Sequence, residues 1–287
     1  MNQKTGPCRS KAVLDEIAEL LRKAYGRDIY PFDETFLAQS LEKRLAAMSI
    51  DTAAAYVERL THDGAEAEAF FHSLNIGYSE FFRDPLVFAL LEQVVLPGLA
   101  HEMKKSGRAE IRVWSAGCSA GQEAWSVAIL LEELTAAREY PIPFRIIATD
   151  VSEAELAAAR RGEYAASALQ NVPLKHIQGY FSRHGETYRI VDRIKDRVDF
   201  SFYDLLDRRS SCPPISIFGE FDMIFCCNLL FYYRPDIRRF ILGKMRCCLS
   251  PKGYLVTGEI EKAFVEEAGG FRTVAPPAAV FKKKNHG

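Results

Sequence analysis

The sequence lacks the patterns that mark several protein classes. It has no C-x-x-C pair and its six histidines do not cluster, so their spacing gives little support to a zinc site. No apolar run approaches the roughly 20 residues that span a bilayer, and the first ten residues have no secretory core. Lys and Arg total 37 against 38 Asp and Glu, so no global positive field attracts nucleic acid. These absences predict a cytoplasmic protein without a metal site, membrane insertion or nucleic-acid partner.

The cysteine content also excludes a disulfide-stapled fold. The seven cysteines are odd in number, and Cys226-Cys227 and Cys247-Cys248 are adjacent pairs. We interpret most of them as small core residues in a reducing compartment. With 287 residues, 48% of them hydrophobic and 26% charged, the chain is long enough for one large domain with a smaller one beside it.

Residues 1–76 are predicted to form an all-helical domain. Apolar residues recur at helical spacing from Val13 to Leu21, and again from Phe36 to Leu45. Asp51-Thr52 is predicted to cap a third helix. No segment of this part of the chain alternates as a strand does.

Residues 77–287 are predicted to form an α/β domain. Strands are expected at 111–114, 145–149, 221–226 and 254–257, and helices at 122–133, 153–161 and 236–249. Such alternation implies a parallel sheet covered on both faces. The segment Gly179–Phe202 alternates between polar and apolar residues, which predicts a small antiparallel β-subdomain at about 179–202.

The ends of the first two strands predict a nucleoside site. A run of small residues, Ser115 to Gly121, follows the first strand and opens a helix, so a ligand can approach its backbone closely. Asp150 ends the second strand, where a carboxylate can accept hydrogen bonds from ribose hydroxyls.

The details of this loop favour a ligand with a cationic end. A dinucleotide site requires G-x-G-x-x-G, but the glycines here are Gly117 and Gly121, and position 119 is serine. Glu123 lies in the first turn of the predicted helix, where it would repel a pyrophosphate. S-adenosylmethionine, which carries a sulfonium and an ammonium group, suits such a site.

Four segments in order then resemble the CheR-type chemotaxis receptor methyltransferases. Residues 114–126, WSAGCSAGQEAWS, resemble the family's WSAGCSTGEEPYS signature, and Phe81-Phe82-Arg83-Asp84-Pro85 resembles its FFRD segment. Ala148 to Ser152 resembles its ATDIS, and residues 221–233 are similar to its FDVIFCRNVLIYF. The resemblance covers about Leu14 to Phe281.

The resemblance implies a Rossmann-like methyltransferase domain with an N-terminal helical domain and a small β-subdomain. It also implies methyl transfer from S-adenosylmethionine, with S-adenosylhomocysteine as product, to glutamate side chains of a protein such as the cytoplasmic helical bundle of a chemoreceptor. The implied catalytic residues are Arg83 and Tyr232. The implied cofactor-binding residues are Gly77, Ser79, Arg83, Ala116, Gly117, Glu123, Asp150, Asp204, Leu205, Cys227 and Asn228.

These residue types are consistent with the chemistry. A glutamate is already ionised at neutral pH, so its attack on a methyl group needs no general base. The carboxylate and sulfonium charges cancel in the transition state, so a water-poor site that aligns the two favours the reaction. A guanidinium at position 83 can hold the incoming carboxylate with two hydrogen bonds.

The chain departs from the family pattern at several positions. The family's Arg in its C-R-N segment is Cys227, its Asn-x-Thr is Gly77-Tyr78-Ser79, and its closing GHSE is Gly258-Glu259-Ile260-Glu261. The stretch that matches the family's basic receptor-binding helix keeps only Lys43 and Arg44 and adds Glu42. This weaker basic patch leaves two alternatives open: a methyltransferase of the same fold that acts on another protein or small molecule, and a non-catalytic module that binds the cofactor or its product.

Overall fold

The computed structural model describes residues 11–106, 108–137, 142–216 and 220–284. The chain divides into two compact units. The first, called the helical unit below, consists of the residues up to Ile76 together with Phe231–Arg238. The second, called the sheet unit, consists of Gly77–Leu230 and the residues from Arg239 onward.

The helical unit contains the predicted N-terminal helices. They are α1 (Lys11–Tyr25), α2 (Glu34–Met48), α3 (Ala53–His62) and α4 (Gly64–Ser73). The side chains of Asp33 and Thr52 accept backbone N–H bonds at the starts of α2 and α3, which satisfies donors that have no partner within the helix. The apolar faces of the four helices bury one core, which includes Ile17, Leu41 and Phe70.

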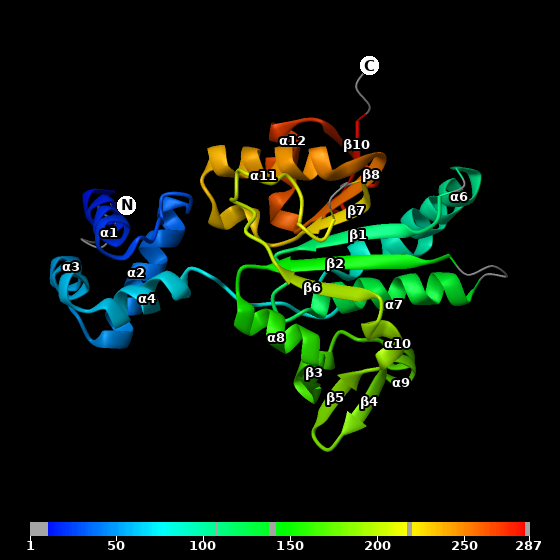
Figure 1. Cartoon of the computed structure of the whole chain (residues 1–287), viewed down its shortest axis with the longest axis horizontal. Coiled ribbons are helices and arrows are strands. Elements are labelled where there is room, and N and C mark those ends of the chain that lie inside the picture. The colour runs from blue at the N-terminus through cyan, green and yellow to red at the C-terminus, as the bar shows by residue number, and fades with distance from the viewer. Residues whose placement is uncertain (1–10, 107, 138–141, 217–219, 285–287) are drawn as a thin grey trace. The chain divides into compact units, whose positions relative to one another are not determined.

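The sheet unit is built on a seven-stranded sheet in the order β6-β2-β1-β7-β8-β10-β9 (Figure 1). Strands β6, β2, β1, β7 and β8 are parallel, and β10 and β9 continue the sheet in antiparallel pairing. The bounds are β1 (Ile111–Ala116), β2 (Phe144–Asp150), β6 (Val198–Phe202), β7 (Phe221–Cys226), β8 (Leu249–Thr257), β9 (Phe271–Thr273) and β10 (Val280–Lys283).

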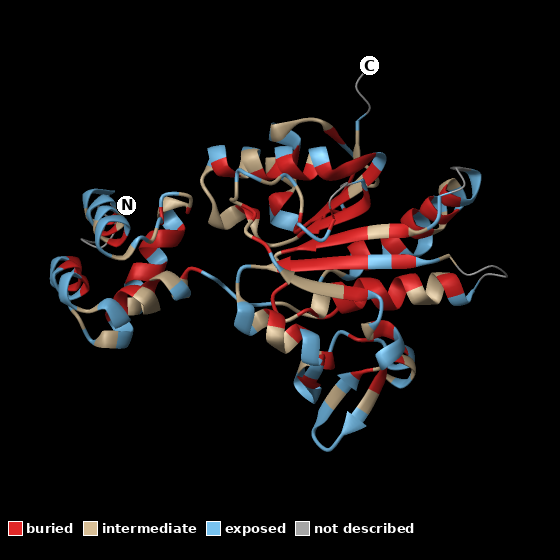
Figure 2. Cartoon of the chain, viewed as in Figure 1, coloured by how far each residue is buried: buried red, intermediate tan, exposed pale blue. Residues whose placement is uncertain are grey.

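Helices cover both faces of this sheet. Helices α7 (Gln122–Ala136) and α8 (Glu153–Arg161) lie on one face, and α12 (Lys262–Ala268) and the part of α11 (Pro235–Cys248) from Arg239 onward lie on the other (Figure 1). Strands β1 and β7 are therefore buried along almost their whole length (Figure 2). Trp114 and Trp125 are buried packing residues, as their positions in β1 and α7 suggest. This arrangement confirms the predicted Rossmann-like α/β fold with an N-terminal helical part.

One helical segment of the sheet unit is apolar enough to attract notice. The segment formed by α5 (Pro85–Leu90), the π-helix η2 (Leu91–Val95) and α6 (Leu96–Ser106) contains one stretch, Pro85–Lys105, with the length and hydropathy of a membrane span. Much of that stretch is buried inside the protein, with 44% of its most apolar window covered, as in a core helix.

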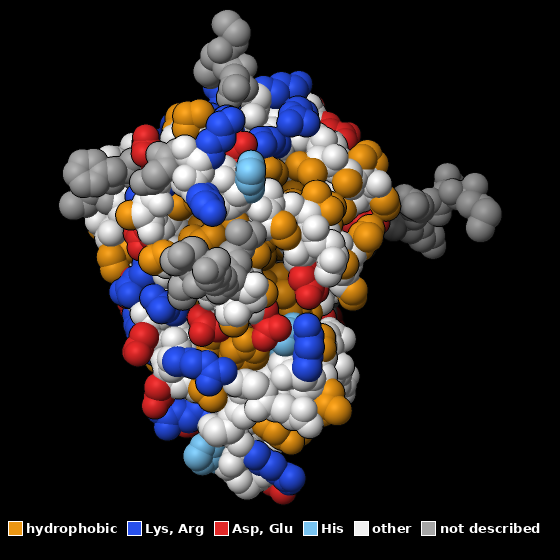
Figure 3. Space-filling model, turned by 90° about the vertical axis from the view of Figure 1, so that its right-hand side faces the viewer, with side chains coloured by type: hydrophobic (Ala, Val, Ile, Leu, Met, Phe, Trp, Pro, Cys, Tyr) orange, Lys and Arg blue, Asp and Glu red, His pale blue; other side chains and the backbone are white. Residues whose placement is uncertain are grey.

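Lys, Arg, Asp and Glu side chains are interspersed over the face shown in Figure 3.

The small antiparallel sheet differs in extent from the prediction. Its strands are β3 (Glu163–Ala165), β4 (Phe181–His184) and β5 (Thr187–Ile190), in the order β3-β5-β4. It is accompanied by η3 (Ala166–Leu169), α9 (Leu174–Tyr180) and α10 (Asp192–Lys195).

The end of the predicted β-subdomain belongs to the large sheet instead. Residues 198–202, placed in the insertion by the sequence pattern, form β6, which pairs in parallel with β2. Arg145 of β2 and Asp199 of β6 form an ion pair across these strands. The prediction was wrong here because polar-apolar alternation is the same for a strand at the edge of either sheet, so it does not identify the pairing partner.

Candidate functional site

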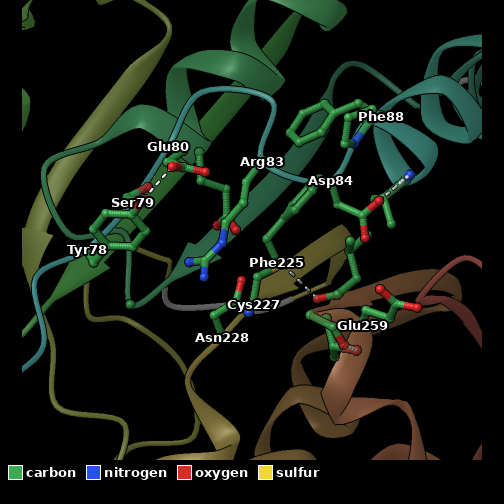
Figure 4. A pocket seen from close by; sticks show the side chains of 17 residues that line it. Tyr78, Ser79, Glu80, Arg83, Asp84, Phe88, Phe225, Cys227, Asn228 and Glu259 are labelled. Carbon is green, nitrogen blue, oxygen red and sulfur yellow. Dashed lines mark hydrogen bonds between the residues drawn. The ribbon is translucent and has the colours of Figure 1, made fainter. Parts of the chain in front are cut away.

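A cavity of about 320 Å³ opens at the carboxyl ends of β1, β7 and β8 (Figure 4). Its lining comes from four stretches of the sheet unit, within 78–88, 117–123, 225–228 and 256–259. Ligands of open α/β sheets bind outside the carboxyl ends of the strands, so this cavity is the candidate functional site.

The loop after β1 forms one wall, and its conformation depends on glycine. Gly117 has a φ of 76° and Gly121 a φ of 90°, a region that residues with a Cβ rarely adopt. A Cβ at Gly121 would also lie 2.9 Å from the Cβ of Ala159. The amides of Gly117 and Cys118 both donate to the Thr149 carbonyl, at 2.8 and 2.9 Å. The backbone of this loop is therefore held at the end of β1, where no bulky side chain at Gly117 or Gly121 keeps a ligand away from it.

Glu123 brings a carboxyl group with an unusual pKa to the cavity. It lies in the first turn of α7 and accepts a 2.6 Å hydrogen bond from the Ser115 hydroxyl. Burial raises the pKa of Glu123 to about 7, although the bond from Ser115 acts in the opposite direction. A cationic ligand beside this side chain would favour its ionised form, so Glu123 suits a ligand with a positive group.

Arg83 is the single cation among the described residues that line the cavity. Its guanidinium carbon lies 5.3 Å from the centre of the Tyr78 ring, in cation–π geometry. The Tyr78 hydroxyl donates to Glu80, which also lines the cavity. Figure 4 shows Arg83 at the cavity between Tyr78 and Cys227. A carboxylate that enters this cavity therefore meets one guanidinium fork.

Glu261 holds the wall formed by the loops after β7 and β8. Its buried carboxylate accepts backbone N–H bonds from Asn228, Leu229, Leu230 and Gly258, at distances of 2.6 to 2.8 Å. Burial raises the pKa of Glu261, and the four backbone bonds act against this rise. Asn228 adopts a φ of 58°. Its side-chain nitrogen Nδ2 would lie 2.7 Å from a Cβ at Gly258, so a larger residue there would displace the Asn228 side chain.

The structure brings six of the predicted site residues together around the cavity. They are Ser79, Arg83, Gly117, Glu123, Cys227 and Asn228. Cys227 stands where the resemblance places an arginine. It approaches the Val256 carbonyl at 3.6 Å and lies within hydrogen-bonding reach of Glu123. Burial raises the pKa of its thiol well above the usual value, so this cysteine is not a reactive thiolate at neutral pH.

The other predicted cofactor residues lie outside the cavity lining. Ala116 is the buried last residue of β1. Gly77 packs against Glu155, whose Oε1 would lie 2.7 Å from a Cβ added at Gly77. Asp150 ends β2 and accepts the N–H groups of Ser119 and Ser152, at 2.8 and 2.9 Å. Its carboxylate thus anchors the loop after β1.

Asp204 and Leu205 lie in the loop that follows β6. Asp204 accepts the Leu206 N–H at 2.8 Å, and the Leu205 carbonyl accepts a 2.8 Å bond from the buried Lys244 ammonium group. Lys244 also donates to the Asp207 carbonyl at 2.7 Å, so one buried lysine fixes this loop.

Tyr232, the second predicted catalytic residue, belongs to the helical unit. It lies in the short helix η4 (Leu230–Tyr232), where its ring packs 4.7 Å from Phe36 and 4.2 Å from Phe231. Its carbonyl accepts the Asp33 N–H at 2.8 Å. It is not one of the residues that line the cavity.

Sequence reasoning missed several residues of the site. Glu80, Asp84 and Glu259 line the cavity with Glu123, so carboxylates outnumber the one described guanidinium there. Glu261 was noted only as part of a departing motif. Its spacing of three residues from Gly258, whose N–H it accepts as the acidic residue of a capping box does, was the signal that could have identified it.

The basic residues predicted on α2 are not both free to meet a partner. Arg44 forms an ion pair with the buried Glu66, which also accepts a 2.5 Å hydrogen bond from the Tyr56 hydroxyl. The guanidinium of Arg44 therefore stabilises the packing of α2, α3 and α4. Lys43 is exposed and is the remaining basic residue of the predicted patch that faces solvent.

Among the described residues, no group of three or more His, Cys, Asp or Glu side chains is arranged to hold a metal ion. Six free cysteines are described, in line with their interpretation as thiols rather than disulfides.

Comparison with known families gives two matches that together span most of the chain. Residues 78–279 match the family described as CheR methyltransferase, SAM binding domain, and residues 12–74 match the CheR methyltransferase all-alpha domain. The cavity lies within the first of these matches.

Curated relatives agree with this assignment. The chain is 32% identical over 246 residues to chemotaxis protein methyltransferase 1 of Pseudomonas aeruginosa, covering 84% of this chain and 86% of that protein. It is 30% identical to the chemotaxis protein methyltransferase of Salmonella typhimurium, covering 88% of this chain and 84% of that protein. Among solved structures, magnesium protoporphyrin IX methyltransferase from Synechocystis with bound SAM matches 74% of this chain and 86% of its own, at 14% identity and a TM-score of 0.36.

Proposed function

Because this chain belongs to the CheR methyltransferase family, we propose that it methylates glutamate side chains of a cytoplasmic chemoreceptor helical bundle. The chain is an S-adenosylmethionine-dependent methyltransferase, and the proposal adds the identity of the acceptor and a cytoplasmic location. One observation carries it: the cavity beside the strand ends presents Arg83 as the single cation among its described lining residues. Such a guanidinium orients a carboxylate side chain, such as that of glutamate, through two hydrogen bonds.

The donor set of the cavity fits S-adenosylmethionine. Glu123 offers a carboxyl to the positive end of the cofactor, and the positive-φ backbone at Gly117 allows close approach. Asp150 is proposed to bind the ribose, and Asp204 and Leu205 to lie beside the adenine. Gly77, Ser79, Ala116, Cys227 and Asn228 are proposed to complete the surroundings of the cofactor. When bound, S-adenosylmethionine supplies an electrophilic methyl group.

The residues of the chain then need to align the acceptor carboxylate with the methyl group and to exclude water from both. They do not need to move protons. A glutamate oxygen attacks the methyl carbon, the bond from that carbon to sulfur breaks, and the products are a methyl ester and S-adenosylhomocysteine. The acceptor is ionised at neutral pH, so no base is required. Arg83 holds the acceptor carboxylate in line, and Tyr232 is proposed to support this alignment. Since opposite charges cancel in the transition state, exclusion of water favours the reaction.

One observation favours a second candidate, a different protein acceptor. Arg44 pairs with Glu66 inside the helical unit, so the exposed face of α2 carries little of the basic charge that would attract an acidic helical bundle. If the acceptor docks on α2, this small charge contributes little attraction for salt to screen. We therefore expect the methylation rate to change only weakly with ionic strength.

The proposed function is tested with methyl-labelled S-adenosylmethionine and the cytoplasmic fragments of chemoreceptors. Label that enters the fragment and is released as methanol by mild base supports a glutamate ester. Base-stable label would show nitrogen or phenol methylation, and label in another protein would show a different acceptor. Tight binding of S-adenosylhomocysteine without transfer to any acceptor would favour a non-catalytic cofactor-binding module.

We expect cofactor affinity to rise with pH through the titration of Glu123. The pKa of this group is raised to about 7 in the free protein, so near pH 6 most molecules carry a neutral Glu123, which holds the ammonium group of S-adenosylhomocysteine poorly. Between pH 6 and 7.5 the affinity for S-adenosylhomocysteine should rise about eightfold, while the α-amino group of the ligand stays mostly protonated. Calorimetric titration at several pH values measures this, and Glu123→Gln should bind weakly with a flat profile. An equally steep profile in Glu123→Gln would assign the titration to another group.

A further inference from the structure

We propose that Ser126 is a positioning residue for Arg83, acting through the backbone of Phe82. The inference rests on the proposed function, in which Arg83 orients the acceptor carboxylate. Ser126 lies on α7, is not among the residues that line the cavity, and is fully buried.

The contact is a hydrogen bond between segments far apart in sequence. The Phe82 N–H donates to the Ser126 hydroxyl oxygen at 3.0 Å in a buried environment. The same hydroxyl donates to the Gln122 carbonyl one turn earlier, at 2.7 Å. The hydroxyl therefore both donates and accepts a hydrogen bond, and these two bonds hold its oxygen in place on the helix surface. Helix α7 is itself held in place, because its residues from Ala124 to Leu131 are buried in the core of the sheet unit.

Phe82 needs such a restraint because its backbone is strained. Its φ is 49°, in the left-handed region that a bulky residue adopts only when its surroundings impose it. Its ring is stacked on His176, with centroids 5.4 Å apart, and packs edge-on against Phe88 at 5.0 Å. The ring contacts and the Ser126 bond together fix both ends of the residue.

The neighbouring residues transmit this restraint to the cavity. Phe81 is fully buried. Its ring centroid lies 4.9 Å from that of Tyr164 and 5.4 Å from that of Phe181, so packing holds the chain in place before Phe82. Asp84, directly after Arg83, accepts the Val87 N–H and starts α5. Between these two anchors, the left-handed turn at Phe82 decides the direction in which the Arg83 side chain leaves the backbone.

Removal of the Ser126 hydroxyl should release this turn without opening the cofactor site. In Ser126→Ala, the Phe82 N–H is left buried without its acceptor. We expect Phe82 to relax to an ordinary φ, in which its N–H finds another partner. This relaxation would change the direction in which the Arg83 side chain points. A displacement of about 1 Å at an aligning group lowers turnover by up to about a hundredfold. Glu123 and Gly117 do not contact Phe82 through any hydrogen bond, so cofactor affinity should stay within about twofold.

Thr135→Val provides a matched control. Thr135 is a buried hydroxyl residue on the same helix and donates to the Glu132 carbonyl at 2.8 Å, but no described segment outside the helix donates to it. A general effect of losing a buried hydroxyl from α7 would appear equally in both variants. The proposed effect appears only in Ser126→Ala.

The test is a double-mutant cycle of Ser126→Ala with Arg83→Ala, followed by methyl transfer and by hydrogen exchange. We expect Ser126→Ala to lower kcat at least about tenfold with little change in S-adenosylhomocysteine affinity, and to cause no further loss in the Arg83→Ala background. The Phe82 amide should exchange faster in Ser126→Ala and unchanged in Thr135→Val.

Multiplicative losses in the two backgrounds, or a Phe82 amide that stays equally protected, would overturn the proposal. The exchange measurement needs no acceptor protein. If the wild-type chain methylates no chemoreceptor fragment, the proposed acceptor fails while the exchange rate of Phe82 still decides whether Ser126 holds the turn.

Discussion

Replacement of Arg83 by alanine is expected to lower kcat for methyl transfer by about a hundredfold, with S-adenosylhomocysteine affinity changed by less than about threefold. Arg83 is the one described cation of the cavity, and four of the other lining residues are acidic. Without the guanidinium, an incoming carboxylate would meet only groups that repel it or leave it unoriented. Steady-state kinetics with an unmethylated protein acceptor, combined with calorimetry of the product complex, separates the two effects.

Arg83→Lys is the matched control for this prediction. A lysine keeps the charge but lacks the planar fork that holds both carboxylate oxygens, so part of the loss should remain. A kcat in Arg83→Ala equal to that of the wild type would show that the acceptor is oriented by other residues. A loss confined to cofactor affinity would place Arg83 among the cofactor-binding residues alone.

Glu261→Gln is expected to lower the free energy of unfolding of the sheet unit by about 3 kcal/mol. The carboxylate of Glu261 accepts four backbone N–H groups, two on each oxygen. An amide nitrogen in place of one oxygen faces two of these donors and leaves them buried without an acceptor. Release of the buried charge offsets part of this cost. Because Asn228 and Gly258 line the cavity, cofactor affinity should fall as well.

Urea denaturation followed by tryptophan fluorescence measures the free energy of unfolding of the sheet unit. The chain has two tryptophans, and both Trp114 and Trp125 lie in the sheet unit. Glu259→Gln is the control, since its side chain lines the same cavity but is 74% exposed and forms a surface ion pair with Lys262. It should change stability by less than about 0.5 kcal/mol. Equal urea midpoints for Glu261→Gln and the wild type would show that the four bonds contribute little.

Local patterns carried much of the fold and part of the site. The helical spacing around Leu14 and Leu41, and the strand–helix alternation after Ile111, are properties of consecutive residues, and the structure contains both. The small-residue loop from Ser115 to Gly121 and the acid in the next helical turn are likewise adjacent in sequence. Since strand order brings the carboxyl ends of parallel strands to one edge, motifs that follow different strands were expected at one site.

What the sequence by itself determined is therefore the family, the α/β fold class and the cavity positions Arg83, Gly117, Glu123 and Asn228, each carried by a motif of neighbouring residues. Only the tertiary structure decided the partners of buried polar groups: Arg44 with Glu66, Ser126 with Phe82, Glu261 with the turn at Asn228. It also decided that Val198–Phe202 joins the large sheet. The physical reason is that periodicity records which face of an element is buried, whereas a hydrogen bond or ion pair depends on which distant segment packs against that face.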